Sequence, residues 1–351
     1  MALEFGIQFF PDVGPAEKSG QDYWSEALHL TGIADDLGFT NVRTVEHYFH
    51  PYGGYSPNPL LFLTAAAMVT TKARLISGAV LPAFNNPLKL AGEIGMLDAI
   101  SGGRLEVGFA RAFLPHEFRA FGVDLNESRA RYAEGIEQVR LLLENEVASH
   151  AGRFHSFRDR TSLPRPTQRP RPPFWVAAFA TPESFAWAGE NGHSIMAIPM
   201  AGGEMAKLIG IYREAWRGAG HPGDGRVMLA FHMFCDTDGG RAAEIARPNL
   251  NGYLASLVDA AGHWLDGESS TDYPGYDKII AGLAAESFES QVEKGAAWIG
   301  EPATIHAAIR DYYELVGGFE IASLQVNFNR LPVDEAERSM RLFAAEVLPL
   351  F

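Results

Sequence analysis

Cysteine is almost absent from this chain of 351 residues, since Cys235 is the only one. An intramolecular disulfide is therefore impossible, which agrees with a reducing, cytoplasmic location. Free cysteine is among the most buried residue types, so we expect Cys235 to be an inert core thiol rather than a nucleophile.

Positive charge is also scarce, because 29 lysines and arginines stand against 43 aspartates and glutamates and give a formal net charge of −14. Nucleic-acid binding needs a basic surface, so the composition predicts no nucleic-acid partner. No apolar run reaches about 18 residues, so we predict no membrane span. The first five residues, Met1-Ala2-Leu3-Glu4-Phe5, lack a basic region followed by an apolar core, and we expect no secretory signal.

Two common signatures of cofactor and metal binding are missing. The turn after the first predicted strand reads Pro11-Asp12-Val13-Gly14-Pro15, without the G-x-G-x-x-G of dinucleotide-binding folds. No H-E-x-x-H or zinc-type Cys/His spacing occurs, so we predict no metal site. A metal held by Glu46, His47 and His50 is the alternative, but no recognised spacing supports it.

Apolar residues make up 47% of the chain, and predicted strands alternate with predicted helices. The strands are expected at Glu4–Phe10, Val42–Val45, Arg74–Leu81, Leu105–Phe109, Pro173–Ala177, Ser194–Ile198, Val227–Cys235 and Ile321–Phe328. Eight such units predict an α/β fold, a closed (β/α)8 barrel that forms one domain over residues 1–351. An open doubly wound sheet is the alternative, and the missing glycine-rich turn counts against it.

Two segments depart from the alternation. Residues 150–173 are rich in Arg and Pro and are expected to run over the surface. Residues 254–300, after the seventh strand, form an insertion whose part 263–277 has little apolar periodicity. Long irregular segments of compact domains are usually lids or disordered, and we favour a lid with a mobile part.

Charged residues follow the second predicted strand, where a barrel places its catalytic groups. Glu46 and His47 come directly after this strand and precede the loop Pro51–Tyr55. Histidine is suited to acid–base chemistry at neutral pH, and Glu46 is expected to orient it or neutralise it. The alternative is a histidine that only holds its loop in place.

Three features suggest an anion site at the same mouth. Arg111 follows the fourth strand, and Arg129 stands at the start of a long helix. In the turn Ala180–Ser184, Thr181 is a plausible N-cap with Pro182 in the first helical position. Arginine side chains and helix N-termini both bind phosphate, so the pattern predicts a phosphorylated cofactor. Ordinary helix caps are the alternative.

Several motifs together resemble those of the bacterial luciferase-like flavin-dependent monooxygenases, above all the luciferase α subunit. They include Val45-Glu46-His47-Tyr48-Phe49, Ser101-Gly102-Gly103-Arg104, Phe118-Arg119-Ala120-Phe121-Gly122, Ser128-Arg129 and Met340-Arg341-Leu342-Phe343, and the resemblance covers nearly the whole chain. It implies a (β/α)8 barrel, usually a dimer, that binds reduced FMN from a separate flavin reductase and uses O2 on a small-molecule substrate. The apolar helices between residues 59 and 100 suit a homodimer interface.

The resemblance also assigns residues. It implies that His47 is catalytic and that Arg111 and Arg129 hold the FMN phosphate, over which the segment with Thr181, Glu183 and Ser184 closes. It places a non-proline cis peptide under the flavin ring at Ser77-Gly78. Further residues expected to contact the cofactor are Ala110, Phe113, Ala178 and Ala180.

Three departures from the luciferase α subunit bear on the activity. Ala110 replaces a cysteine beside the flavin, Tyr48 replaces a second histidine, and the segment Ala197–Gly203 differs. We therefore expect oxygenation of another small organic molecule without light emission. Two alternatives stay open, a deazaflavin-dependent dehydrogenase on the same fold and a non-catalytic flavoprotein that stores FMN.

Overall fold

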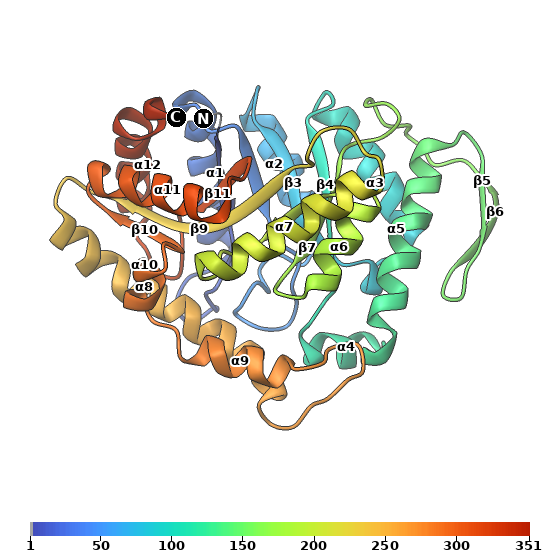
Figure 1. The fold of residues 1–351 in the computed structure, drawn as a ribbon. Helices are drawn as coiled ribbons and strands as arrows, with labels where there is room; N and C mark the ends of the chain where they lie inside the picture. The colour runs from blue at the N-terminus through green and yellow to red at the C-terminus, as the bar shows by residue number, and fades with distance from the viewer. Residues whose placement is uncertain (1–2) are drawn as a thin grey trace.

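The computed structural model describes residues 3–351 and shows a closed barrel of eight parallel strands surrounded by helices (Figure 1). Each strand pairs with the next, and β11 returns to β1. The barrel strands are β1 (Glu4–Phe9), β2 (Asn41–Thr44), β3 (Arg74–Val80), β4 (Leu105–Ala110), β7 (Phe174–Ala178), β8 (Ser194–Ala197), β9 (Val227–Cys235) and β11 (Ile321–Gln325). The predicted (β/α)8 barrel is confirmed, and the predicted strand ends differ by a few residues.

The helices around the barrel begin and end at the signals that the sequence provides. Ser19 caps α1 by accepting a hydrogen bond from the Asp22 backbone, and Gly38, with φ of 91°, ends it. Proline occupies the first turn of α2, α3, α6 and α11. The surrounding helices are α1 (Gly20–Leu37), α2 (Pro59–Val69), α3 (Pro87–Ile100), α5 (Ser128–Glu144), α6 (Pro182–Glu190), α7 (Gly202–Gly218), α11 (Pro302–Val316) and α12 (Val333–Glu346). No helix within residues 3–351 is long and apolar enough to cross a membrane.

The barrel interior is filled near the N-terminal ends of its strands. Ile76, Trp175, Met228 and Ile321 are fully buried there and form a separate apolar cluster with Met196. Trp175 donates its indole N–H to Glu106 Oε2 (2.6 Å). This filling leaves the C-terminal strand ends as the place for a ligand.

The motif Ser101–Arg104 has a structural role. The guanidinium group of Arg104 donates to the backbone carbonyls of Ala67, Thr70 and Ala73. These bonds satisfy carbonyls at the end of α2, which has no basic residue in its last turn. The motif therefore joins α2 to the start of β4.

The surface excursion predicted at 150–173 overlaps a two-stranded antiparallel hairpin that projects from the barrel (Figure 1). Its strands are β5 (Ala148–Ala151) and β6 (Ser156–Arg160). The hairpin was not anticipated, because its strands are only four and five residues long and largely exposed.

The insertion after β9 is more regular than the sequence indicated. Its elements are α8 (Gly239–Ala260), α9 (Tyr276–Ala284), α10 (Phe288–Glu293) and β10 (Ala297–Gly300), which pairs parallel with β9. The expected break at Leu254 is wrong, because α8 continues to Ala260 with Pro248 inside it. The elements α9, α10 and β10 are too short to give a clear periodic signal.

Residues 261–284, including α9, lie across the C-terminal end of the barrel beside the short helix α4 (Pro115–Phe121), as Figure 1 shows. The buried Trp264 donates its indole N–H to Phe113 O (2.9 Å), and Tyr273 donates its hydroxyl to Ala112 O. We call residues 261–284 the lid. These contacts fasten the lid to the segment that follows β4.

Candidate active site

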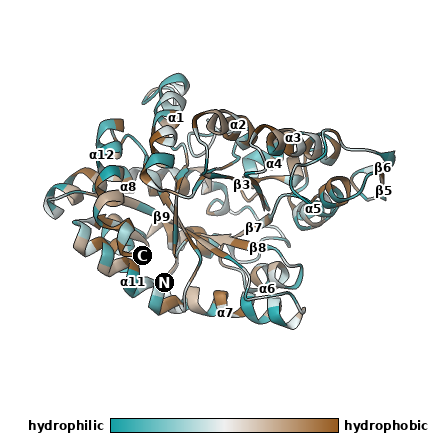
Figure 2. Cartoon of the chain, turned by 90° about the horizontal axis from the view of Figure 1, so that it is seen from above, coloured by the Kyte–Doolittle hydropathy of each residue, from teal (hydrophilic) through white to brown (hydrophobic). Residues whose placement is uncertain are grey.

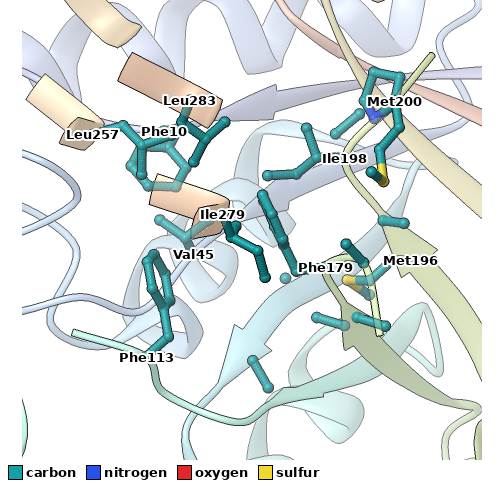
Figure 3. Close-up of a pocket in the computed structure, with 18 of the residues that line it drawn as sticks. Phe10, Val45, Phe113, Phe179, Met196, Ile198, Met200, Leu257, Ile279 and Leu283 are labelled. Atoms are coloured by element: carbon teal, nitrogen blue, oxygen red, sulfur yellow. The ribbon is translucent and has the colours of Figure 1, made fainter. Parts of the chain in front are cut away.

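A cavity of about 430 Å³ lies between the C-terminal strand ends and the lid. This volume is within the range of about 300–1,000 Å³ that is usual for small-molecule sites. Figure 3 shows apolar side chains from the barrel and the lid around a common space. The labelled ones are Phe10, Val45, Phe113, Phe179, Met196, Ile198, Met200, Leu257, Ile279 and Leu283.

His47 lines this cavity and is held by a carboxylate that the sequence analysis did not identify. Its Nδ1 donates to Oε1 of Glu117 (3.1 Å), which also accepts from the Tyr48 backbone N–H (2.8 Å). Glu117 lies in the first turn of α4 and is fully buried. Within residues 3–351, no hydrogen-bond partner contacts His47 Nε2. Nε2 is therefore the nitrogen left for a ligand.

Glu46 also lines the cavity, but its carboxylate serves another purpose than the one expected. It accepts from the Leu81 backbone N–H (3.0 Å), from Asn85 Nδ2 (2.9 Å) and from the Tyr48 hydroxyl. Burial raises the pKa of Glu46 to about 7. The prediction that Glu46 orients His47 is corrected, because these donors occupy both of its oxygens and Glu117 takes that role.

The glycine loop next to His47 supports its ring. Gly53 has a φ of 80° and donates its N–H to Pro11 O (2.6 Å). A Cβ atom at Gly53 would lie 2.5 Å from the Cβ of His47. Only glycine combines this conformation with such a close approach.

Three of the residues predicted for the anion site lie at the cavity wall. Arg111, Thr181 and Ser184 all line the cavity, and the latter two lie at the N-terminus of α6. The Thr181 hydroxyl contacts the Ser184 hydroxyl (2.7 Å) and does not cap the helix backbone as expected. Two hydroxyls at the N-terminus of α6 and one guanidinium group therefore line the same cavity, and groups of these kinds bind phosphate.

Arg129 and Glu183 are exposed and do not line the cavity. The backbone N–H of Arg129 donates to Asp272 Oδ2 in the lid (2.8 Å), as does the Ser128 hydroxyl (3.1 Å). Arg111 donates to the backbone carbonyl of Asp272 (2.7 Å). The start of α5 and Arg111 are thus both bound to one lid residue.

Ser77 does not line the cavity either, because its side chain lies between two strands. Its hydroxyl donates to Gly108 O (3.1 Å) and accepts from Gly108 N (2.9 Å). The non-proline cis peptide joins Gly78 to Ala79, one residue later than expected, and both of these residues line the cavity. The other expected cofactor contacts, Ala110, Phe113, Ala178 and Ala180, also line it.

Four polar residues on the barrel strands also line the cavity and were not predicted from the sequence. They are Gln8, Arg43, His232 and Gln325, and we call them the cavity floor. Arg43 donates to Gln8 Oε1 and to Gly78 O (2.9 Å). Burial lowers the pKa of His232 to about 3. A charged residue inside the four-residue strand β2 was the available signal for Arg43.

No cluster of three or more His, Cys, Asp or Glu side chains within residues 3–351 is arranged to hold a metal ion. The alternative set of Glu46, His47 and His50 is not assembled. His50 Nε2 contacts Asp259 (3.0 Å), and its Nδ1 accepts from the Tyr52 backbone N–H.

Several known proteins are similar to this chain. Residues 3–318 match the family model of the luciferase-like monooxygenases. The oxygenase component of a flavin-dependent trigonelline monooxygenase from Acinetobacter baylyi is 33% identical over 239 residues. That match spans 67% of this chain and 65% of the relative's own length.

Two solved structures are similar over 99% of both chains. Monooxygenase RslO1 from Streptomyces bottropensis has 41% sequence identity and a TM-score of 0.88. The oxygenating constituent of 3,6-diketocamphane monooxygenase from Pseudomonas putida, in complex with FMN, has 22% identity and a TM-score of 0.83, a likeness of fold. With the family match over most of its length, the chain belongs to the luciferase-like monooxygenase family.

Proposed function

We propose that this protein is the oxygenase of a flavin-dependent monooxygenase, which uses reduced FMN and O2 to oxygenate a small organic substrate. The observation that carries the proposal is the buried His47–Glu117 pair at a cavity whose wall also carries Arg111, Thr181 and Ser184. Bound reduced FMN supplies the electrons that activate oxygen, and the protein positions and shields it. The solved relative with FMN supports this choice of cofactor.

The residues of the cavity fit FMN in two respects. Arg111, Thr181 and Ser184 offer a guanidinium group, two hydroxyls and a helix N-terminus to the phosphate. A wall of small residues, Gly78, Ala79, Ala110, Ala178 and Ala180, leaves room for a flat ring. A Cβ atom at Gly78 would lie 1.8 Å from Arg43 Nε, so a larger residue at this position would displace the Arg43 side chain.

His47 would hold and move a proton at the cavity. Glu117 fixes the ring through Nδ1, which leaves Nε2 free to donate to a ligand or accept from it. The lid and the apolar walls exclude water from this position. Glu46 keeps the segment after β3 in place through Leu81 and Asn85.

The substrate would be apolar and small, since Ile279 and Leu283 of the lid, together with Phe10 and Leu257, form an apolar side of the cavity. Ala110 and Tyr48 differ from the luciferase residues, so we propose oxygenation without light. The trigonelline enzyme is described as an oxygenase component, which supports a separate flavin reductase for this chain as well. A cytoplasmic location would give access to that reductase.

A homodimer is part of this proposal, and its support is an exposed apolar surface. The largest exposed side chains of α2 are Leu61 and Met68, at 71% and 75% exposure, and Met96 on α3 is 57% exposed. Figure 2 shows the hydrophobic colour of α2 and α3 side by side. Such a surface is typical of a protein interface. We call α2 and α3 the apolar face.

Anaerobic titration with reduced FMN, followed by mixing with oxygenated buffer, tests the proposed activity. We expect saturable binding and, after mixing, a lower yield of hydrogen peroxide than from free reduced FMN. His47→Ala should bind FMN with an affinity within about threefold of that of the wild type. Its turnover rate should fall by at least about 10²-fold. Reduction of a deazaflavin without consumption of O2, or full turnover by the variant, would contradict the proposal.

A further inference from the structure

Arg43 is a cation of the cavity floor, and it has no counter-ion within residues 3–351. It lies on β2, is partly buried, and its accessible part lines the cavity. No aspartate or glutamate among residues 3–351 forms an ion pair with it, and only the neutral oxygens of Gln8 and Gly78 accept its hydrogen bonds. Buried charges in proteins are normally paired, so an unpaired one beside a cavity suggests that the ligand carries the opposite charge.

The surrounding residues fix the guanidinium group in place. The side chain of Gln8 is held through Gln325 (3.3 Å) and Ser323 (3.3 Å), so its Oε1 is directed to Arg43. The Nε atom lies against Gly78, where any Cβ atom would displace it. Burial lowers the pKa of Arg43 to about 10, and the group remains protonated at neutral pH.

The neighbouring titratable groups leave this charge uncompensated. Burial raises the pKa of Tyr253 to about 12 and that of Tyr52 well above its ordinary value, so both phenols stay neutral. His232 is also neutral, since burial lowers its pKa to about 3. Glu46 binds Leu81 and Asn85, and His47 binds Glu117.

The other cations that line the cavity have different positions. Arg111 lies at the proposed phosphate site and contacts the lid. Lys278 and Lys294 belong to α9 and to the end of α10, and Lys294 pairs with Glu286. A flavin whose phosphate is bound by Arg111 would have its ring elsewhere in the cavity, and Arg43 is the cation that the cavity floor would offer to that ring.

We propose that Arg43 is the counter-ion of the reduced flavin ring, where it stabilises the negative charge left when the N1 position loses its proton. This proposal rests on the proposed function. Arg43 would be a positioning residue whose charge makes the protein bind reduced FMN more tightly than oxidised FMN. Oxidised flavin is neutral in its ring, so Arg43 stabilises it less. Charge near this part of a flavin is a known way in which a protein tunes the cofactor.

The test compares affinities for oxidised and reduced FMN in the absence of substrate. Arg43→Gln should weaken binding of reduced FMN by about tenfold or more, relative to its effect on oxidised FMN. A tenfold change in this ratio equals a downward shift of about 30 mV in the two-electron potential. Arg43→Lys should retain most of the selectivity. Arg111→Gln is the matched control and should weaken both redox states alike, because the phosphate charge does not depend on the redox state.

The wild-type protein supplies a second readout that needs no variant to fold. As the pH is lowered, bound reduced FMN should keep the spectrum of its anionic form at pH values where free reduced FMN is already protonated. An unchanged affinity ratio in Arg43→Gln, or a bound cofactor that protonates like the free one, would overturn the inference and leave the oxygenase proposal standing. Failure to bind FMN in either state would overturn both.

Discussion

His47 takes its orientation from a residue 70 positions later in the chain. Glu117 is fully buried, and its Oε1 accepts both from the His47 ring and from the Tyr48 backbone. A buried carboxylate is costly unless it is paired and hydrogen-bonded. The pair therefore joins the end of β2 to α4 and presents one ring nitrogen to the cavity.

Replacing Glu117 by glutamine should separate orientation from charge. The amide can still accept from Tyr48, but it cannot stabilise a protonated His47, so we expect turnover to fall by about 10²-fold. Glu117 does not line the cavity, so FMN affinity should stay within about twofold. Stopped-flow reoxidation of bound reduced FMN and the hydrogen peroxide yield measure the effect. Wild-type kinetics in Glu117→Gln would contradict the assigned role.

His232 should make the protein sensitive to acid. The ordinary pKa of histidine is 6.5, and burial lowers that of His232 to about 3. Between these values the unfolded chain binds a proton that the folded protein does not, so stability falls as the pH falls. In His232→Gln, the loss of unfolding free energy between about pH 7 and pH 5 should be smaller by about 2 kcal/mol. Urea unfolding at both pH values measures it, and equal losses in variant and wild type would contradict it.

Residues of the site differ in how readily the sequence discloses them. His47 could be found because a charged pair directly after a strand has no place in a core. Arg43 gave a comparable signal within its strand. Glu117 gave none, because its role depends on α4 folding back over the end of β2. The cis peptide was predicted at Ser77–Gly78, one residue before its observed position, because residue types alone do not determine which peptide bond is cis.

At the scale of elements, the lid is the part that meets the cofactor site. Asp272 places its carboxylate on Ser128 and on the backbone N–H of Arg129, and its carbonyl accepts from Arg111. A carboxylate at a helix N-terminus occupies the kind of position that suits a phosphate. In the proposed complex, the FMN phosphate and the Asp272 carbonyl both accept from Arg111, so the lid and the cofactor would compete for this donor.

Removal of this carboxylate should favour the cofactor. We expect Asp272→Ala to bind FMN about 2–5-fold more tightly, because loss of the carboxylate releases the lid from the start of α5, and the backbone carbonyl at position 272 then leaves Arg111 more readily. Asp277→Ala is the matched control, because Asp277 is an exposed lid residue in the first turn of α9. Fluorescence titration compares the two variants. Unchanged or weaker binding in Asp272→Ala would show that the lid does not compete.

The elements also show where periodicity fails as a guide. The barrel units were predictable because each repeats an apolar strand and an amphipathic helix. A lid was expected in the insertion, but its helices were not, since the fixed points of the lid are single aromatic residues, Trp264 and Tyr273, that donate to backbone carbonyls across the chain. Such contacts leave no regular spacing in the sequence.

At the scale of the whole molecule, the apolar face is a surface that the fold of a single chain leaves exposed. Leu61, Met68 and Met96 are exposed, whereas the cavity lies at the strand ends. Apolar surface of this kind is favourably buried by a second copy of the chain. Association would therefore leave the cavity accessible.

Met68→Glu should convert the expected dimer into a monomer, because a charge on the apolar face would have to be desolvated on association. Leu315→Glu is the control, since Leu315 is 59% exposed on α11, outside the apolar face. Sedimentation velocity distinguishes the two states. A monomeric wild type, or a dimeric Met68→Glu, would contradict the proposed interface.

The hydrogen bonds of Asp272 to Arg111 and to the start of α5 affect the rate at which the cofactor would bind. In the proposed complex, reduced FMN would bind Arg111 fully only after Asp272 has moved away from it. The observed rate of capture would then rise with FMN concentration only up to a plateau, set by the opening rate of the lid. A reductase that keeps free reduced FMN scarce would operate below that plateau, where uptake follows supply.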